Sequence, residues 1–387
     1  MKRVVILGST GSIGCSAIEI LERSRDEFDV VGLAAGGRVE ELERQLATFP
    51  GARFALRDAG SLARIVARNP ALEGRAAGCG SEGLMRLVRE LSPDLVVNAL
   101  VGIVGLVPTV VALENGCAVA LANKETLVTG GELIERLAGP RRGAIIPIDS
   151  EHFSISRCLA GFRDETVELV LTASGGPFHG RGFAELQAVT AADALAHPTW
   201  KMGPKVTVDS ANLLNKGLEV IEAHWLFGFP YPAIKVVIHP QSIVHSIVRL
   251  RDGSLIAHLA PADMRLPLMN ALHYPEVREF PWSALSLEDL GRLEFVPFER
   301  EAYPAFSLAL AAAEVGGSAP AVLNAADEIA VEAFLAGRIG FQTIVTWIDE
   351  ALSAHRVRAV QQVTDILEAD RWTREFLASN HAEVSAP

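Results

Sequence analysis

KRVVILGSTGSIG, residues 2–14, is the stretch that decides the fold of this chain. Its first half is apolar and predicts a short buried strand over Arg3–Leu7. Its second half has the pattern G-x-x-G-x-x-G and opens a helix. Glycines at such a turn let a pyrophosphate approach the backbone, and the helix N-terminus favours negative charge. A glycine-rich turn can also be purely structural, so the elements that follow decide between the two interpretations.

Those elements alternate between strand-like and helix-like patterns up to about residue 150. The expected strands are Arg3–Leu7, Val30–Ala34, Leu95–Asn98, Ala118–Ala120 and Ala144–Pro147, and the expected helices between them include Cys15–Arg23, Glu40–Thr48 and Glu82–Leu91. Strands separated by helices predict a parallel, doubly wound sheet. The first part of the chain is therefore predicted to be a Rossmann-like α/β domain that binds a dinucleotide.

The pattern changes after residue 150, where longer strands appear. They are Val167–Thr172, Lys235–Ile238, Ser242–Leu250 and Ser254–Leu259, the last two joined by a predicted hairpin at Arg251-Asp252-Gly253. We expect a nucleotide-binding domain over residues 1–149, an α+β catalytic and dimerisation domain over 150–275 and a linker over 276–302. A C-terminal helical domain over 303–375 and a flexible tail over 376–387 complete the expected organisation.

Composition excludes several classes of protein. The chain has 387 residues and a formal net charge of -12, which argues against a general nucleic-acid or anionic-membrane surface. The apolar run Leu95–Leu113 is broken by Asn98, two glycines and Pro108, so we expect a strand, a loop and a helix rather than a membrane span. The four cysteines form no CxxC pair, and because a strand-like run begins at residue 2, we expect no signal peptide. A cytoplasmic protein is expected.

The end of the second strand indicates which dinucleotide binds. An NAD site usually has an acidic residue there to bind the ribose hydroxyl. Here the strand runs VVGLAAGG and is followed by Arg38, a cation that suits a 2′-phosphate. NADP is therefore preferred over NAD, with a solvated helix-start residue as the alternative for Arg38.

The segment VDSANLLNKGLEVIEAHWLF, residues 208–227, predicts a helix with an unusual polar face. Asn212, Asn215, Lys216 and Glu219 have the spacing of one helix face. Ser210 just upstream can cap this helix or turn towards the same face. The group suits a ligand with a phosphate and a metal-bound end, and a solvated amphipathic face is the alternative.

A carboxylate pair follows the apolar strand at residues 145–148. Asp149 and Glu151 flank Ser150, and in an extended chain positions i and i+2 share a face. Together with Glu219 they form an all-oxygen triad that suits Mg²⁺ or Mn²⁺. Without Glu219 the pair would more often be an exposed loop.

Three further segments are candidates for ligand contacts. Ala173–Phe178 (ASGGPF) offers a hydroxyl and backbone N–H groups to an anion. Residues 196–204 (AHPTWKMGP) have the composition of a lid. Asn123-Lys124-Glu125 follows a strand where it could reach cofactor and substrate. Each segment alone could be a structural turn or loop.

These motifs together resemble the 1-deoxy-D-xylulose 5-phosphate reductoisomerase family. The resemblance runs from GSTGSIG at Gly8 to LNAADEIAVEAFL at residues 323–335. The motifs between them are ANKE at Ala122, DSEH at Asp149, ASGGPF at Ala173, HPTWKMGPK at His197, NKGLEVIEAHWLF at Asn215, HPQSIVHS at His239 and DMRLP at Asp263.

The resemblance implies a V-shaped homodimer that binds a small phosphorylated ketose, NADPH and Mg²⁺ or Mn²⁺. It implies that Asp149, Glu151 and Glu219 hold the metal. The implied substrate contacts are Lys124, Ser150, Glu151, Ser174, His197, Ser210, Asn215, Lys216 and Glu219, with Trp200 and Met202 on a flexible flap. The implied cofactor contacts are Thr10, Gly11, Ser12, Ile13, Gly36, Gly37, Arg38, Asn123, Glu125 and Gly203.

The implied reaction has two stages, carbon–carbon cleavage and rejoining of 1-deoxy-D-xylulose 5-phosphate followed by reduction by NADPH. The product would be 2-C-methyl-D-erythritol 4-phosphate, a precursor in the non-mevalonate isoprenoid pathway. Two alternatives stay open: another NADP-dependent dehydrogenase, such as one acting on a semialdehyde, and a non-catalytic NADP sensor.

Three positions depart from the family's usual pattern. The segment Phe153–Arg157 differs after DSEH, which puts the packing behind the metal site in doubt. Gly37 stands where a cation is common, and Arg38 follows it. Asp327 stands where Asn is commoner.

Overall fold

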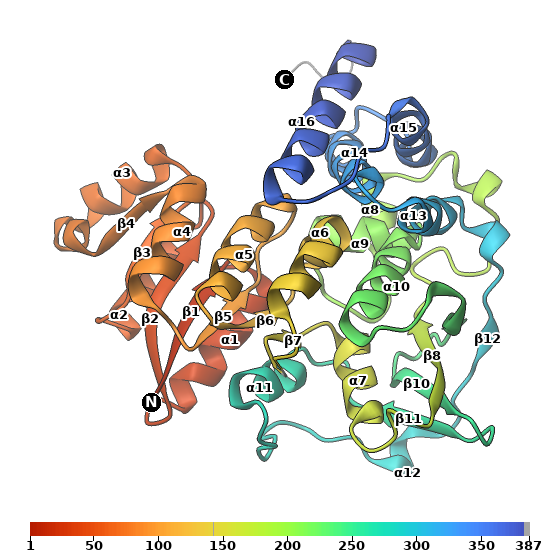
Figure 1. The fold of residues 1–387 in the computed structure, drawn as a ribbon, viewed down its shortest axis with the longest axis horizontal. Coiled ribbons are helices and arrows are strands. Elements are labelled where there is room, and N and C mark those ends of the chain that lie inside the picture. Colours follow the sequence, from red (N-terminus) through yellow and green to blue (C-terminus); the bar gives the residue numbers. More distant parts are fainter. Residues whose placement is uncertain (142, 383–387) are drawn as a thin grey trace. The chain divides into compact units, whose positions relative to one another are not determined.

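The computed structural model describes residues 1–141 and 143–382 (Figure 1). Two compact units are found. Unit 1 comprises Met1–Thr126, Ile134–Ser150 and Asp263–Trp282, and unit 2 comprises Leu127–Leu133, Glu151–Ala262 and Ser283–Pro387. Each unit is formed by three separate stretches of the chain, whereas the domains expected from the sequence are consecutive. The expected domain boundaries stay a prediction.

Unit 1 is built on a seven-stranded sheet with the order β4-β3-β2-β1-β5-β6-β7. Every pairing in it is parallel, which confirms the doubly wound sheet predicted from the sequence. The strands are β1 (Lys2–Leu7), β2 (Phe28–Ala35), β3 (Arg53–Leu56), β4 (Ala76–Cys79), β5 (Leu95–Asn98), β6 (Ala118–Leu121) and β7 (Ile145–Pro147). The sequence reading missed β3 and β4, four-residue strands with little apolar pattern.

Helices pack on this sheet, including one that returns from much later in the chain. Helix α11 (Arg265–His273) places Leu268 and Leu272 in the core of unit 1, although the sequence assigned this region to the catalytic domain. Its Arg265 also forms an ion pair with Glu19 of α1, with 3.2 Å between Nη1 and Oε1. The other helices of this region are α1 (Ser12–Arg23), α2 (Val39–Thr48), α3 (Ala59–Arg68), η1 (Pro70–Arg75), α4 (Gly80–Leu91), η2 (Ile103–Gly105), α5 (Leu106–Glu114) and α6 (Lys124–Ala138).

Unit 2 contains a five-stranded mixed sheet with the order β11-β10-β8-β9-β12. The hairpin predicted around Asp252-Gly253 is confirmed, because β10 and β11 pair antiparallel across it. The expected linker contributes β12, which pairs with β9. The strands are β8 (Thr166–Ala173), β9 (Ile234–Ile238), β10 (Val244–Leu250), β11 (Leu255–Leu259) and β12 (Val296–Pro297).

The helices of unit 2 include a C-terminal group, as predicted. Helix α16 runs to Asn380, so residues 376–380 of the expected tail are helical, and residues 383–387 of that tail lie outside the described residues. The longer helices are α7 (Ser150–Leu159, which starts at the boundary of unit 1), α8 (Ala191–Leu195), α9 (Pro204–Ala211), α10 (Leu214–Phe227), α13 (Pro304–Val315), α14 (Ala319–Leu335), α15 (Phe341–Ala354) and α16 (Val363–Asn380). The short ones are η3 (Phe183–Leu186), η4 (Tyr231–Ala233), α12 (Leu287–Leu290) and η5 (Arg300–Ala302).

The single helix predicted over residues 208–227 is wrong. The chain forms α9, a break at Asn212-Leu213, and then α10. Leu213 has a left-handed conformation with φ 60°, and its side chain is buried with Ala173 and Ile238. Asn212 accepts a hydrogen bond from the N–H of Leu214, so it supports the break and is not part of the polar face of α10.

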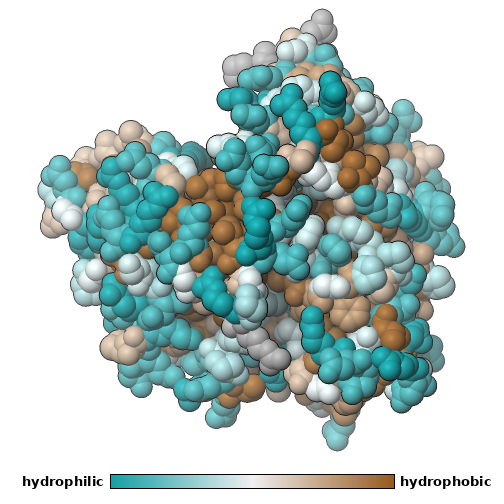
Figure 2. All heavy atoms as spheres, in the orientation of Figure 1, coloured by the Kyte–Doolittle hydropathy of each residue, from teal (hydrophilic) through white to brown (hydrophobic). Residues whose placement is uncertain are grey.

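Hydrophilic side chains cover much of the surface in the view of Figure 2. Unit 1 shows a hydrophobic area around α5 in this view. Val101 and Val104, just ahead of α5, are 60% and 42% exposed. Within the described residues, no helix combines the length and apolar character that a membrane crossing requires, in line with the interpretation of Leu95–Leu113 as a strand, loop and helix.

Candidate active site

The glycine turn after β1 has the geometry of a dinucleotide site. Gly8 has φ +88°, and a side chain there would overlap the carbonyl of Ala99 at the end of β5. A Cβ on Gly14 would lie 2.6 Å from Cα of Ser9, so only glycine lets α1 start this close to the strand. Gly11 is the N-cap of α1 and makes no side-chain cap, which leaves the helix N-terminus available to a phosphate.

Asn123 and Glu125 brace the neighbouring loop after β5. The Asn123 amide donates to the carbonyls of Leu100 and Gly102 at 3.1 and 3.0 Å, and Glu125 accepts from the Gly102 N–H at 2.8 Å. Both side chains are buried. Within unit 1 they hold the loop that lies against Gly8, and the cofactor contacts that the resemblance implies for them stay a prediction.

The turn at Gly36-Gly37-Arg38 carries more positive charge than the sequence indicated. Arg38 is exposed at the N-cap of α2. Arg64 of α3 donates to the Gly37 carbonyl at 3.0 Å, and the Arg57 guanidinium lies 3.8 Å from the position of a Cβ on Gly37. Arg57 directly follows β3 and Arg64 belongs to α3, two elements that were not predicted from the sequence, and no local motif indicates these arginines.

Two predicted metal ligands lie where β7 passes into α7. Asp149 directly precedes the helix and forms an ion pair with Lys124. Glu151 lies in the first turn, and its carbonyl accepts a hydrogen bond from Ser246 of β10 at 2.9 Å. The chain is helical from Ser150, so the extended geometry expected for these two carboxylates is wrong.

Lys216 joins the third carboxylate to this group. Its Nζ lies 2.8 Å from Oε1 of Glu151 and donates a hydrogen bond to Glu219. Burial by itself lowers the pKa of Lys216, but the charges of Glu151 and Glu219 outweigh it and raise the pKa above its ordinary value. Asn215 donates to Glu219 at 2.6 Å. Asn215 and Lys216 therefore contact a predicted metal ligand directly, and the substrate contacts that the resemblance implies for them stay a prediction.

The donor set fits a hard divalent cation. Asp149, Glu151 and Glu219 each offer an oxygen, and these ligand atoms lie within 4.8 Å of one another. An all-carboxylate set suits Mg²⁺ or Mn²⁺ better than Zn²⁺. Glu219 is almost completely buried, which is costly for a carboxylate without cationic partners.

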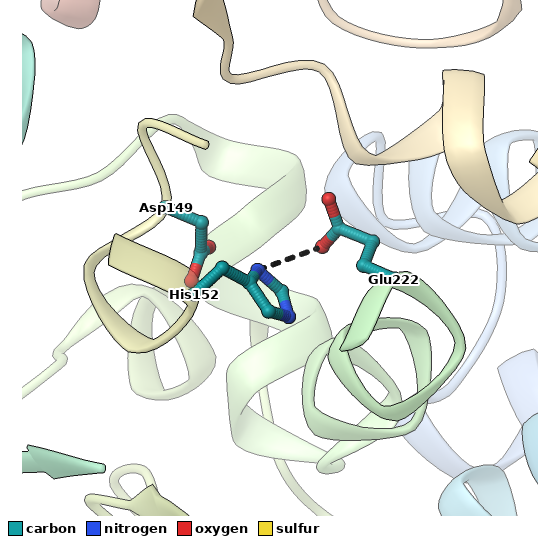
Figure 3. Close-up of side chains that lie close together, drawn as sticks. All are labelled: Asp149, His152 and Glu222. Atoms are coloured by element: carbon teal, nitrogen blue, oxygen red, sulfur yellow. Dashed lines mark ion pairs between the residues drawn. The ribbon is translucent and has the colours of Figure 1, made fainter. Parts of the chain in front are cut away.

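His152 and Glu222 lie behind this group and were missed by the sequence reading. Figure 3 shows His152 between Asp149 and Glu222, with an ion-pair distance of 3.7 Å from its Nδ1 to the Glu222 carboxylate. Its Nε2 lies 2.9 Å from the carbonyl of Glu219, which can only accept, so Nε2 carries the proton. His152 therefore ties α7 to α10 beside two metal ligands. The DSEH motif contains this histidine, but no sequence motif identifies Glu222 as its partner.

The predicted anion loop follows β8. The Ser174 hydroxyl lies 3.0 Å from Nε2 of His197 and accepts from the Gly176 N–H at 3.2 Å. Burial lowers the pKa of His197, which keeps the ring neutral at pH 7. A Cβ on Gly176 would lie 2.6 Å from the Ser210 carbonyl, so this loop packs directly on the end of α9. The structure thus places Ser174 beside His197 and the backbone of Ser210 beside the same loop, and their role as phosphate contacts stays a prediction.

The predicted lid has no regular secondary structure between α8 and α9. His197 Nδ1 accepts from the N–H of Trp200 at 2.9 Å, and the Trp200 ring lies 5.9 Å from the ring of His245. Met202 is half-buried, and Gly203 is the exposed N-cap of α9. Gly203 belongs to unit 2, while the other predicted cofactor residues belong to unit 1.

The remaining uncertain positions have structural explanations. A Cβ on Gly217 would lie 2.6 Å from Cβ of Ala309, so this glycine allows α10 to pack against α13. Phe153, in the segment that departs from the family pattern, is buried in α7 and packs edge-on against His258.

Comparison with known proteins gives consistent matches along the chain. Residues 4–131 match the 1-deoxy-D-xylulose 5-phosphate reductoisomerase profile, and residues 145–227 and 259–376 match two C-terminal domain profiles of the same enzyme. The Mycobacterium marinum enzyme of this name is 50% identical over 96% of this chain and 91% of its own length. The Mycobacterium tuberculosis enzyme is 48% identical over 96% and 89%.

Solved structures agree with these matches. The reductoisomerase from Zymomonas mobilis in complex with NADPH superimposes with a TM-score of 0.88, 34% identity and complete coverage of both chains. A DOX-P reductoisomerase in complex with NADPH, fosmidomycin and magnesium superimposes with a TM-score of 0.91 and 34% identity over 98% of both chains.

Proposed function

We propose that this chain, which belongs to the 1-deoxy-D-xylulose 5-phosphate reductoisomerase family, carries out the reaction of that family. It is an NADPH- and divalent-metal-dependent oxidoreductase that converts 1-deoxy-D-xylulose 5-phosphate to 2-C-methyl-D-erythritol 4-phosphate in the non-mevalonate isoprenoid pathway. The observation that carries the assignment of the site is the group formed by Glu151, Lys216 and Glu219, with Asp149 beside it.

Asp149, Glu151 and Glu219 would hold the metal. When bound, the metal would stabilise oxyanion charge on the substrate and NADPH would supply the hydride. Lys124 lies against Asp149, where its ammonium can orient that carboxylate and contact the hydroxyl and carbonyl end of the substrate together with Ser150. His152 supports the geometry by tying the helices that carry Glu151 and Glu219.

The substrate phosphate would bind between the Ser174 loop, the end of α9 and the start of α10. Ser174, Ser210 and Asn215 offer hydrogen-bonding groups, Lys216 offers charge, and neutral His197 lies beside Ser174. Binding at this remote group positions the reacting carbons and contributes energy to the chemical step. The segment carrying Trp200 and Met202 would exclude water by closing over the substrate.

NADPH would bind along the carboxyl edge of the sheet in unit 1. Thr10, Gly11, Ser12 and Ile13 would receive the pyrophosphate at the start of α1. The arginines at the Gly36–Arg38 turn favour a 2′-phosphate over a free hydroxyl. Asn123 and Glu125 would act mainly by holding the loop after β5.

We also propose that the protein is a cytoplasmic homodimer. Strand β11 is an edge of the sheet in unit 2 with Leu255 exposed on it, and edge strands are surfaces that a second chain can cover. All four cysteines are free thiols, as is usual in a reducing compartment.

One assay tests the proposed function. Oxidation of NADPH should occur with 1-deoxy-D-xylulose 5-phosphate and Mg²⁺ or Mn²⁺, and should stop when EDTA removes the metal. Turnover that survives EDTA would favour a metal-independent NADP dehydrogenase. Binding of NADPH without oxidation by any phosphorylated ketose would favour a sensor.

A further inference from the structure

Asp327, the residue that departs from the family pattern, lies in a buried charged group in unit 2. Lys205 of α9 donates a hydrogen bond to its carboxyl group, and the same ammonium lies 2.7 Å from Asp209, one turn further along α9. The side chains of Asp327 and Asp209 are only 1% and 2% exposed, and that of Lys205 is 14% exposed. One ammonium therefore links two buried carboxyl groups, one on each of two helices.

This charged group connects helix α9 to α14, one of the C-terminal helices. It begins at Gly203, at the end of the predicted lid, and Lys205 lies in its first turn. Its last turn carries Ser210, whose hydroxyl donates to the Val206 carbonyl at 2.7 Å and whose own carbonyl packs on Gly176. The contact between Lys205 and Asp327 thus holds the start of α9, and the other end of this short helix packs on the anion loop.

We propose that Asp327 is a positioning residue: through Lys205 it holds α9, and with it Ser210, in place for the phosphate of the substrate, and loss of its proton loosens that hold. This inference rests on the proposed phosphate role of Ser210.

The charges around Asp327 explain why its proton matters. Burial, joined by repulsion from Asp209, raises the pKa of Asp327 to about 8, while Lys205 acts in the opposite direction. Glu328, next to it on α14, adds repulsion and is itself paired with Arg374 of α16 at 2.5 Å, which also binds Asp370. The acidic residues of the other helices packed on α14 are exposed at their C-terminal ends: Glu314 on α13, and Asp349 and Glu350 on α15.

The sign of the pH effect follows from this shift. Asp327 keeps its proton in the folded protein up to about pH 8, whereas the exposed side chain loses it near 4. Between these pH values, Asp327 releases its proton when α9 opens. The protection of the α9 backbone amides from hydrogen exchange therefore falls by up to about tenfold per pH unit. Above pH 8 the folded protein itself carries two carboxylates against one ammonium, and the Michaelis constant for substrate should rise.

Asp327→Asn tests the proposal because it keeps the shape and one acceptor oxygen but cannot lose a proton. At pH 7 we expect the variant to have KM and kcat within twofold of the wild type. At pH 9.5 the KM of the wild type for 1-deoxy-D-xylulose 5-phosphate should rise several-fold relative to the variant, with little change in kcat. Asp327→Ala removes the tie and should raise this KM about tenfold at every pH, with the KM for NADPH unchanged.

Hydrogen exchange supplies a readout that needs no turnover. Amides of α9 in the wild type should lose protection from pH 6 to 8, after correction for intrinsic rates, while those of Asp327→Asn should not. Asp370→Asn is the matched control, since Asp370 is a buried acid of α16 that pairs with Arg374, and it should follow the wild type in both assays.

Identical pH profiles of KM and of α9 protection in wild type and Asp327→Asn would overturn the proposal. An effect confined to kcat, or shared by Asp370→Asn, would also overturn it. A wild type that shows altered α9 exchange as predicted but no turnover of the substrate would refute the proposed function and leave the role of Asp327 in holding α9 supported.

Discussion

Lys216→Met gives the sharpest test of the metal and phosphate site. The substitution removes the ammonium and keeps most of the apolar stem. Lys216 is 4% exposed, and it contacts Glu151 and the almost fully buried Glu219. Breaking a buried ion pair by removing one partner costs about 3–5 kcal/mol, because the remaining charge is left without compensation. Glu151 is 17% exposed, so water can solvate part of its uncompensated charge. We therefore expect Lys216→Met to lower the free energy of unfolding by about 3 kcal/mol, the low end of this range.

A divalent cation should reverse most of this loss. Glu151 and Glu219 are proposed metal ligands, so a bound cation would replace the charge that Lys216 supplied. Metal at a hundred times its dissociation constant stabilises a folded protein by about 2.7 kcal/mol. In the variant the carboxylates should bind metal more tightly, and metal should therefore stabilise the variant by roughly 2 kcal/mol more than it stabilises the wild type.

Urea unfolding followed by tryptophan fluorescence, in EDTA and in saturating Mn²⁺, measures this difference. Lys235→Met, an exposed lysine on β9, is the control and should respond to metal as the wild type does. Equal stabilisation of wild type and Lys216→Met by Mn²⁺ would refute the idea that Lys216 shields the metal ligands. The same substitution should raise the KM for substrate about 10- to 100-fold, because it removes one charge-assisted hydrogen bond to the phosphate. An unchanged KM would exclude Lys216 from the phosphate site.

Four further substitutions test other parts of the structure. Glu219→Gln should keep NADPH binding, measured by fluorescence titration, but lose most turnover; near-normal rates in saturating Mn²⁺ would exclude it from the metal shell. Gly217→Ala should lower the free energy of unfolding by about 1 kcal/mol, because crowding against Ala309 outweighs the helix-propensity gain of roughly 1 kcal/mol, and a stabilised variant would contradict this. Arg38→Ala and Arg64→Ala should each reduce the preference for NADPH over NADH about tenfold in kcat/KM, and an unchanged ratio would exclude that arginine from the 2′-phosphate site.

The fold of unit 1 was predictable because its signals are local. An apolar run followed by glycines at fixed spacing identifies a strand and a turn without knowledge of distant residues. The short strands β3 and β4 give no such signal, since Arg53–Leu56 and Ala76–Cys79 are recognisable only through their neighbours in the sheet. The return of α11 to unit 1 depends on contacts between residues more than 240 positions apart, as between Glu19 and Arg265.

The candidate site was predictable in its residue types but not in its pairings. Spacing suggested that Lys216 and Glu219 share a helix face, and they do. It could not show that Lys216 reaches Glu151, which lies 65 positions away, or that Arg64 reaches the turn before Arg38. Glu222 was overlooked because its partner His152 comes from another helix, and a buried acid on an apolar helix is recognisable only when its partner is known.

Leu213 shows why one predicted helix became two. A left-handed conformation costs a residue with a side chain about 1–2 kcal/mol, and glycine would avoid that cost. Leucine nevertheless stands here, since its side chain is buried against Ala173, at the end of the strand that leads to the anion loop, and against Ile238 at the end of β9. Burial of a leucine contributes about 1.5–3 kcal/mol, enough to offset the strained backbone. The break is thus specified by packing. Because of it, the relative orientation of Ser210 and Lys216 is not set by the geometry of one continuous helix. Helix α9 can therefore be positioned by its contact with Asp327, and α10 by its contact with Glu151.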